Sequence, residues 1–440
     1  MHTETPWYKL FDYIVKKPET EYLSYFIKLY PEIEVNIEDS TFFIRNQFIT
    51  GNFDKSPQCT GFLDYSSFPD ESYQWIEYNE VYEYDDVLWG TYYFQNIIWE
   101  HQHPSSSTCD ELQYLIIGDY DSSFGFEITV LTSYLALAEK YNRIAIWSPF
   151  IYSKYTNITF CKEQSFSCFF HSLSSCELNK EEYIKWINHE KSIYNHQISI
   201  IHNKQDIYDH MDKRIWYVSN TLEFRNTIPQ YIRKFYNVTN VPRSYYIQYW
   251  RIQAITYMLR PTHDVLEWIR IFTNTNYTGD PMNTHNDICV HIYHNPRNLN
   301  EKLVENYNYL SSIQLLEKIK HSRNASIFLN TNDPGSLSYF FRMTSLNIHY
   351  NKYPRSLCLE RNHTLNRSIY PLIELANLKT SLDCFDSIST SINSWQRIIQ
   401  SLRITVGMRS SSYYIDIGDL PCLNDQHCKL IHKQYEYIYW

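Results

Sequence analysis

The sequence predicts an α/β protein of two lobes, each built around a parallel sheet. Two strand–helix patterns separated by a loop-like stretch support this fold class. In the first pattern, the apolar runs 112–118 and 144–147 are typical of buried strands. Between them, Leu131, Leu135 and Ala138 recur at the period of a helix. Strand, helix and strand in this order predict a parallel pair joined by a right-handed crossover.

The stretch between the two patterns holds one further helix. Residues 150–240 are predicted to be loop-rich, with three nearby cysteines as staples. A helix over 245–260 is predicted to end at Arg260, because Pro261 cannot continue it. Residues 272–287 are rich in Asn, Thr, Gly and Pro, and are predicted to be a linker. The second pattern is therefore expected to fold as a separate lobe.

The second pattern starts at Ile288. An apolar strand from this residue runs into a polar, basic loop, followed by a predicted helix over 301–320 and a strand over 326–330. Further on, the hydroxyl-rich run 386–391 precedes a predicted helix over 395–404. The order of strand, helix and strand again predicts a parallel sheet.

The length of the chain sets its domain organisation. A chain of 440 residues is too long for one ordinary hydrophobic core, so more than one domain is expected. Residues 1–100 are aromatic, acidic and irregular, and are predicted to be a divergent N-terminal region. The predicted lobes cover residues 101–275 and 285–420, and residues 421–440 form a tail.

Composition excludes several classes of function. Hydrophobic residues make up 43% of the chain and charged residues 20%, which is typical of a globular protein. The net charge is −10 and no stripe rich in Lys and Arg is present, so nucleic acid is excluded as a partner. No run approaches the roughly 20 apolar residues of a membrane span, and no signal sequence precedes the first lobe.

Cysteine and histidine patterns argue against a metal site. The chain has 10 Cys, which is high for a cytosolic protein and compatible with a secretory compartment. No C-x-x-C pair is present and the His residues are scattered, so no metal ligand is assigned.

Two polar loops point to a nucleotide pocket. The run from Asp287 to Arg297 is a short strand that ends in a polar, basic loop, and the run from Ser326 to Pro334 repeats this plan. In open α/β sheets, ligands bind outside the carboxyl ends of the strands. Two such loops close together in sequence therefore predict a nucleotide-binding site.

These runs resemble the α-1,6-fucosyltransferase family, the enzymes that add core fucose to N-glycans. The two family loops read V-H-V-R-R-T-D-K, with a glutamate soon after, and Y-L-A-T-D-D-P. The resemblance covers about residues 95–420. Further matching segments are 249–253 with 257–261 (W-W-x-x-Q and Y-L-I-R-P), 169–176 (V-F-R-P-V-S-E-T-C), 123–125 (G-Y-G) and 413–416 (D-I-Y-Y).

The resemblance implies a fold, a reaction and a location. It implies two Rossmann-like lobes in a GT-B-like architecture, with the C-terminal lobe holding the nucleotide-sugar donor. The implied reaction is inverting transfer of fucose from GDP-fucose to a glycan or glycoprotein acceptor, without a metal or a resident cofactor. The family is anchored in the Golgi. Because this chain shows no anchor or signal, a soluble cytoplasmic location stays open beside the Golgi or secretory lumen.

Inverting transfer needs a base for the acceptor hydroxyl and donors or positive charge for the departing diphosphate. Glu301 lies ten residues after His291, at the position of the glutamate that the family is expected to use as its base; the alternative is an exposed glutamate at a helix N-terminus. Arg297 falls on the family's lysine; the alternative is a surface arginine. His291 matches directly as a donor to phosphate or ribose; the alternative is a packed histidine.

Tyr293 and His294 are the main departure from the family. They stand where the family has two arginines, the first of which is expected to hold the pyrophosphate. Tyr offers one neutral hydroxyl donor, whereas Arg offers five donors and a permanent charge. Loss of a charge-assisted contact costs about 1.5–3 kcal/mol. This corresponds to a loss of roughly tenfold to hundredfold in binding or rate.

The rest of the predicted nucleotide site follows from the second loop and the later segment. Asp333 is a candidate to bind guanine or ribose; the alternative is a turn residue before Pro334. Hydroxyl-rich turns are also common as simple caps. The further candidates are Thr331, Asn332, Glu374, Ser389 and Thr390.

Three interpretations of function remain open. The first is a fucosyltransferase-like enzyme, which Glu301 and Arg297 favour. The second is a catalytically degenerate member that binds glycan or nucleotide, which Tyr293, His294 and Pro296 favour. The third is an unrelated α/β protein whose motifs match by accident.

Overall fold

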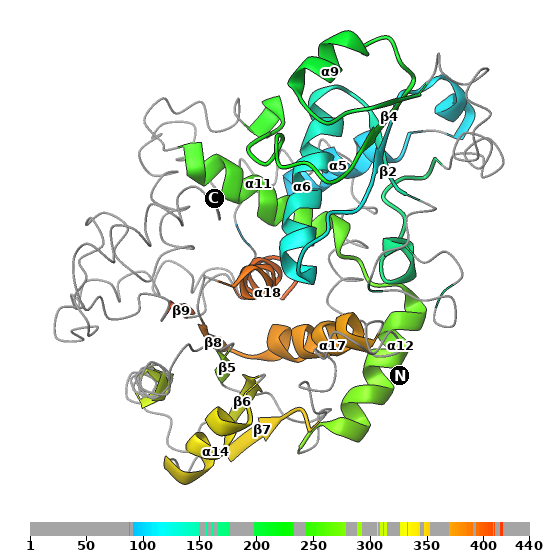
Figure 1. The fold of residues 1–440 in the computed structure, drawn as a ribbon. Coiled ribbons are helices and arrows are strands. Elements are labelled where there is room, and N and C mark those ends of the chain that lie inside the picture. The colour runs from blue at the N-terminus through cyan, green and yellow to red at the C-terminus, as the bar shows by residue number, and fades with distance from the viewer. Residues whose placement is uncertain are drawn as a thin grey trace, which may run out of the picture. The chain divides into compact units, whose positions relative to one another are not determined.

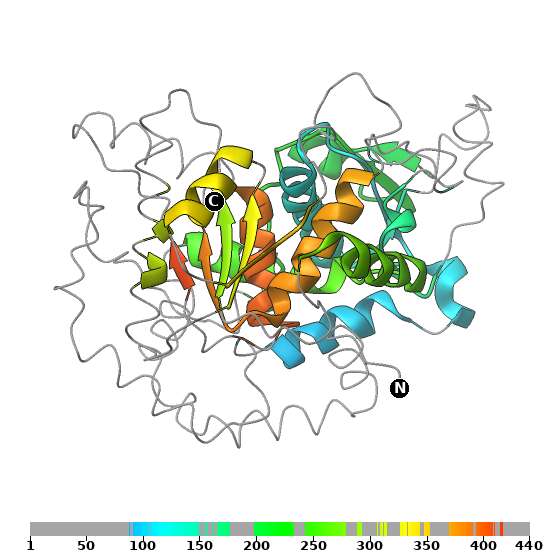
Figure 2. The same cartoon turned by 90° about the horizontal axis from the view of Figure 1, so that it is seen from below.

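The computed structural model divides the chain into two compact units (Figures 1 and 2). The division falls between Leu266 and Glu267, with Leu88 in the second unit and Ile369 in the first. The structure describes residues 88, 91–104, 106–148, 155, 161, 165–176, 198–232, 243–278, 288–292, 306, 309–310, 312–314, 326–331, 333–343, 347–352, 369–389, 393–407, 409 and 414–416.

The first unit contains a four-stranded parallel sheet. Its strands are β1 (Tyr114–Ile117), β2 (Ile144–Trp147), β3 (Ile198–Ile200) and β4 (Ile215–Val218), in the order β2-β1-β4-β3. All three strand pairs are parallel. The helix α6 (Phe124–Lys140) joins β1 to β2 and packs against both. This confirms the predicted strand–helix–strand unit.

Further helices complete the first unit. The helices α5 (Thr91–Gln102) and α11 (Arg243–Met258) pack together, and α11 also packs on α6. Trp250 of α11 donates from its indole N–H to the carbonyl of Thr132 in α6 at 3.0 Å. The shorter helices are η3 (Ser106–Glu111), η4 (Phe166–Cys168) and α9 (Lys204–Asp209).

The segment 150–240 was predicted to be loop-rich, but it contains two strands and a helix among its described residues. It contributes β3 and β4, which are two of the four strands of the first sheet, and the helix α9 between them. Asn203 and Asp206 form a reciprocal capping box at the start of α9. The prediction was wrong because β3 and β4 are short, and their burial depends on pairing with each other and with β1, which lies far away in the sequence.

The second unit contains a five-stranded parallel sheet. Its strands are β5 (Ile288–Ile292), β6 (Ser326–Thr331), β7 (Asn347–Tyr350), β8 (Asp386–Ser389) and β9 (Tyr414–Asp416). Their order is β7-β6-β5-β8-β9, and every pair is parallel. Both sheets thus have the parallel, helix-connected form of the predicted fold class, which is confirmed.

Helices lie on both faces of the second sheet. The helix α14 (Pro334–Met343) lies on one face, and α17 (Ile369–Asp383) and α18 (Ser394–Ile404) lie on the other (Figures 1 and 2). Apolar side chains of the strands form the core with two residues of the segment 309–314, Tyr309 and Ile313. A sheet covered on both faces explains why β5 is buried at every position and why β5 and β6 are largely apolar.

The linker predicted over 272–287 begins later than expected. The helix α12 (His263–Asn276) continues through the first five of these residues, and the rest lie outside the described residues apart from Tyr277 and Thr278. Phe272 and Thr273 are buried, so packing on the apolar side of the helix outweighs the weak helix propensity of the Asn and Thr residues.

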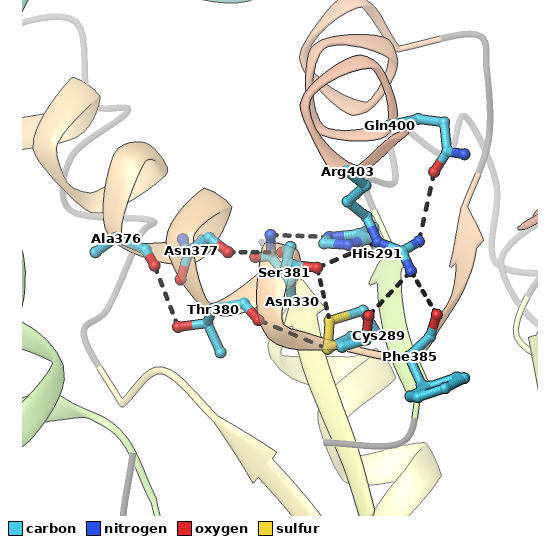
Figure 3. Close-up of a disulfide and its surroundings, with 11 residues drawn as sticks. Cys289, His291, Asn330, Ala376, Asn377, Thr380, Ser381, Phe385, Gln400 and Arg403 are labelled. Carbon is cyan, nitrogen blue, oxygen red and sulfur yellow. Dashed lines mark hydrogen bonds between the residues drawn. A yellow bond between two sulfur atoms is a disulfide. The ribbon is translucent and has the colours of Figure 1, made fainter. Parts of the chain in front are cut away.

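Three disulfides join described residues. Cys109 pairs with Cys176 and Cys161 with Cys168 in the first unit. In the second unit, Cys289 of β5 pairs with Cys384, which follows α17 (Figure 3). All three cysteines of the middle segment therefore form disulfides. Two of them pair with each other, and Cys176 pairs with Cys109, which precedes β1.

Candidate functional site

The structure places five of the predicted site residues and leaves six outside its description. His291 lies in β5, Thr331 ends β6, Asp333 precedes α14, Glu374 lies in α17 and Ser389 ends β8. The six that lie outside the described residues are Arg297, Glu301, Tyr293, His294, Asn332 and Thr390.

The parallel sheet brings three of these residues to one edge. The strands β6, β5 and β8 are neighbours, so their carboxyl ends lie side by side. Thr331 is in register with Ile292, and His291 is in register with Asn330. Ser389 ends the strand on the other side of β5. Residues predicted from three separate sequence segments therefore converge on the edge where α/β proteins bind ligands.

His291 is buried and fixed by three side chains. Its exposed fraction is 1%, and its ring Nδ1 lies 3.1 Å from the amide nitrogen of Asn330. Its backbone carbonyl accepts hydrogen bonds from the Tyr309 hydroxyl at 2.7 Å and from the Gln396 amide at 3.1 Å. Both the ring and the main chain at the end of β5 are thus held in one arrangement. None of these three partners was predicted from the sequence as a site residue.

Asp333 caps a helix. Its carboxylate accepts hydrogen bonds from the backbone N–H of Gly335 at 3.3 Å and of Ser336 at 2.6 Å, and from the Ser336 hydroxyl at 2.5 Å. These are the donors at the open end of α14, and Pro334 begins that helix. The geometry supports the alternative interpretation of Asp333 as a turn and capping residue.

Glu374 lies on the amino-terminal half of α17 and is 1% exposed. Three residues further on, Asn377 accepts hydrogen bonds from the Tyr277 hydroxyl at 2.6 Å and from the Asn351 amide at 3.3 Å. Asn351 directly follows β7, so this half of α17 lies near the carboxyl ends of the strands. Glu374 therefore belongs to the same end of the second unit as His291.

The buried guanidinium of Arg403 forms hydrogen bonds at the carboxyl-terminal end of α17. Its nitrogens donate to the backbone carbonyls of Ser381 at 3.2 Å, Cys384 at 3.1 Å and Phe385 at 2.9 Å (Figure 3). These carbonyls lie at the end of α17 and just before β8, where an arginine satisfies unpaired acceptors and the helix dipole. Arg403 thus stabilises the fold at the amino-terminal edge of the sheet.

A cation at the carboxyl edge was missed by the sequence analysis. Arg397 lies in the first turn of α18, next to Gln396, and its guanidinium donates to the Ser394 hydroxyl at 3.2 Å. Four residues separate the end of β8 from the start of the helix, and Asn393 caps the helix by accepting from the N–H of Trp395. A capped helix start with a partly exposed arginine is a signal that the sequence carried, at N-S-W-Q-R.

The segments 169–176 and 257–261 lie together in the first unit. Phe170 forms an antiparallel bridge with Pro261, and Arg260 donates to the carbonyls of Tyr257 at 2.8 Å and Ser172 at 2.7 Å. The Arg260 guanidinium also lies 5.1 Å from the centre of the Trp99 ring. These contacts give the two segments a structural role in the first unit.

His103 belongs to the same cluster. Its ring stacks on Trp99 with 3.7 Å between ring centroids. Burial, reinforced by the positive charge of Arg260, lowers the pKa of His103 to about 4. His103 is therefore neutral near pH 7.

The described residues contain neither a candidate membrane span nor a candidate metal site. Within the part of the chain that the structure describes, no helix combines the length and the apolar character that a bilayer span requires. Among those residues, no group of three His, Cys, Asp or Glu side chains is placed to bind a metal ion.

The fold and the polar edge together define an α/β protein with two parallel sheets and a candidate ligand site at the carboxyl ends of β5, β6 and β8. No protein-family model matches the sequence, and no curated protein matches it. Matches among solved structures include a mutant of Arabidopsis thaliana FUT1 in complex with GDP. It is 11% identical with a TM-score of 0.44, over 70% of this chain and 77% of that one.

Two further solved structures are similar to the chain. One is fucosyltransferase NodZ from Bradyrhizobium, with 12% identity, a TM-score of 0.38, and coverage of 66% of this chain and 92% of that chain. The other is POFUT1 in complex with GDP-fucose, with 10% identity, a TM-score of 0.39, and coverage of 70% and 98%. At such identities and TM-scores, these similarities assign no function to the chain.

Proposed function

We propose that the chain is a fucosyltransferase-like glycosyltransferase that binds a GDP-sugar at the carboxyl edge of its second sheet and transfers fucose with inversion. The observation that carries this proposal is the convergence of His291, Thr331 and Ser389 on neighbouring strand ends. These residues match the nucleotide-binding loops of the family that the sequence resembles, and the strand ends of a parallel sheet are a common setting for nucleotide binding.

The proposed chemistry divides between binding and proton transfer. His291, Thr331 and Ser389 supply neutral polar groups near the nucleotide. Arg297, five positions after the last residue of β5 in the sequence, supplies positive charge for the diphosphate. Glu301 takes the proton from the acceptor hydroxyl, so that the oxygen attacks the anomeric carbon while GDP departs from the opposite face. No step needs a metal or a resident cofactor.

The acceptor and compartment follow from chemistry and resemblance. The acceptor is proposed to be a glycan on a glycoprotein, with the N-glycan core as the first candidate because the resembling family acts there. Three disulfides between described residues favour the oxidising lumen of the secretory pathway, including the Golgi, over the cytosol.

The alternative is a degenerate member that binds nucleotide or glycan without transfer. Two observations favour it: Tyr293 replaces the family's pyrophosphate arginine, and Asp333 is engaged in capping α14. The change Tyr293→Arg separates the two functions. In a weakened enzyme it should tighten GDP binding by roughly tenfold or more, because a charge-assisted contact is restored. The Tyr293→Phe variant controls for loss of the hydroxyl, and undetectable binding in the Arg variant would favour a lost pocket.

The proposal is tested by measuring transfer and donor binding separately. Glu301→Gln should abolish fucose transfer while the dissociation constant for GDP changes little, because a base acts on the acceptor proton. Glu305→Gln makes the same substitution four residues later and should retain transfer. If the Glu301 variant transfers fucose at the wild-type rate, Glu301 is not the base. If the wild-type chain binds GDP and transfers nothing to any glycan offered, the alternative stands.

A further inference from the structure

We propose that Asn330 is a positioning residue that holds neutral His291 with its single ring proton on Nε2. The fixed Nε2–H is then a hydrogen-bond donor for the nucleotide-sugar at the carboxyl edge of the sheet. The tautomer itself is a property of the unliganded chain, whereas its use in donor binding rests on the proposed function.

The geometry of the pair carries the inference. His291 and Asn330 are register partners on β5 and β6, and both are 1% exposed. The amide nitrogen of Asn330 lies 3.1 Å from His291 Nδ1. An amide nitrogen donates and cannot accept, so Nδ1 must present its lone pair. A neutral imidazole carries one proton, which therefore resides on Nε2.

The surroundings of His291 keep this arrangement rigid. Tyr309 and Gln396 of α18 donate hydrogen bonds to its carbonyl, and Asn330 of β6 contacts its ring. Hydrogen bonds from several elements to one buried residue favour a single conformation of a site. The three contacting side chains are uncharged, and the contact to the ring is the hydrogen bond from Asn330.

Asn330 is a feature of this chain rather than of the resembling motif. When Phe328–Pro334 is set against Y-L-A-T-D-D-P, Asn330 falls on the alanine. Alanine has no group that can bond to a histidine ring. The control of the His291 tautomer is thus an addition in a chain that has also lost the first motif arginine at Tyr293. The neutral Nε2–H of His291, held in a fixed direction, would give the site one defined hydrogen bond. This chain lacks the charged contact that the family's arginine supplies at the position of Tyr293.

The test combines a spectroscopic signature with binding. The full chain is labelled with ¹⁵N-histidine, and the His291 signals are assigned by their loss in His291→Gln. In the absence of ligand, we expect the Nε2-protonated tautomer in the wild type. Asn330→Ala should give a mixture of tautomers, and Asn330→Asp should move the proton to Nδ1, because a carboxylate only accepts. Asn377→Ala, a matched change on α17, should leave the tautomer unchanged.

The outcomes separate this inference from the proposed function. A proton on Nδ1 in the wild type, or a tautomer unaltered in Asn330→Ala, overturns the inference whatever GDP does. With the tautomer confirmed, Asn330→Ala should weaken GDP binding by about twofold to tenfold without a matching loss of thermal stability. An unchanged GDP affinity in that variant would overturn the role of the tautomer in binding. If the wild type binds no GDP, the proposed function fails while the tautomer result stands.

Discussion

The disulfide between Cys289 and Cys384 provides a quantitative prediction for the second unit. Its two sulfur-bearing residues are fully buried, and they are separated by 95 positions in the sequence. In the chain-entropy description, closing a loop of this length stabilises the fold by about 4.7 kcal/mol. The Cys161–Cys168 bridge closes only 7 positions, which corresponds to about 2.4 kcal/mol. The long bridge should therefore contribute about twice as much.

Hydrogen exchange measured by mass spectrometry is the appropriate assay, because a two-unit chain need not unfold in a single step. In a Cys289→Ala/Cys384→Ala variant, we expect amides of β5 and β8 to exchange up to about 2,000-fold faster. The Cys161→Ala/Cys168→Ala variant should leave these amides unchanged, because its bridge lies in the first unit. Exchange in β5 within about threefold of the wild type would refute the stabilising role of the long bridge.

Two further predictions concern buried cationic and titratable groups. Arg403→Leu leaves three carbonyls near the end of α17 without their donor. This substitution should lower the free energy of unfolding of the second unit by about 3 kcal/mol or more. As a control, Arg342→Leu at an exposed position should lower it by less than about 0.5 kcal/mol. Equal effects of the two substitutions would contradict the capping role of Arg403. Because the folded pKa of His103 is about 4 and its unfolded value is 6.5, the unfolded chain binds more protons between these values. Thermal stability of the first unit should fall as pH falls from 6.5 to 4, and His103→Phe should reduce this slope; identical slopes would contradict the prediction.

Continuous apolar runs made much of the fold predictable. The strands β1, β2, β5 and β6 were expected because each is a short run of mostly apolar residues followed by polar ones. The end of α11 was expected from Pro261, and the helix stops at Met258.

Other elements owe their burial to distant partners. The β8 sequence Asp-Ser-Ile-Ser looks like a polar turn, yet all four residues are buried between β5 and β9. Its burial depends on strands far away in the sequence, which no local pattern reveals. The same reason explains why β4 was missed despite its apolar residues: its neighbours β1 and β3 had to be known first.

The candidate site was predictable in outline but not in its contacts. The positions of His291 and Ser389 at strand ends followed from the motif order. The bond between His291 and Asn330 joins residues 39 positions apart, and it depends on the register of β5 and β6. The capping role of Asp333 was predictable in principle, because an acidic residue before a helix-initiating proline is a common helix start.

Calorimetric titration of the full chain with GDP, GDP-fucose and a uridine diphosphate sugar tests the central claim most directly. We predict saturable binding of GDP and GDP-fucose with a dissociation constant below about 1 mM, and no saturable binding of the uridine nucleotide. His291→Gln should weaken the binding of both guanine ligands, because this residue lies next to the carboxyl end of β5, the central strand of the site. No saturable heat with either guanine ligand at several-fold higher concentration would contradict a GDP-sugar site at this edge of the sheet.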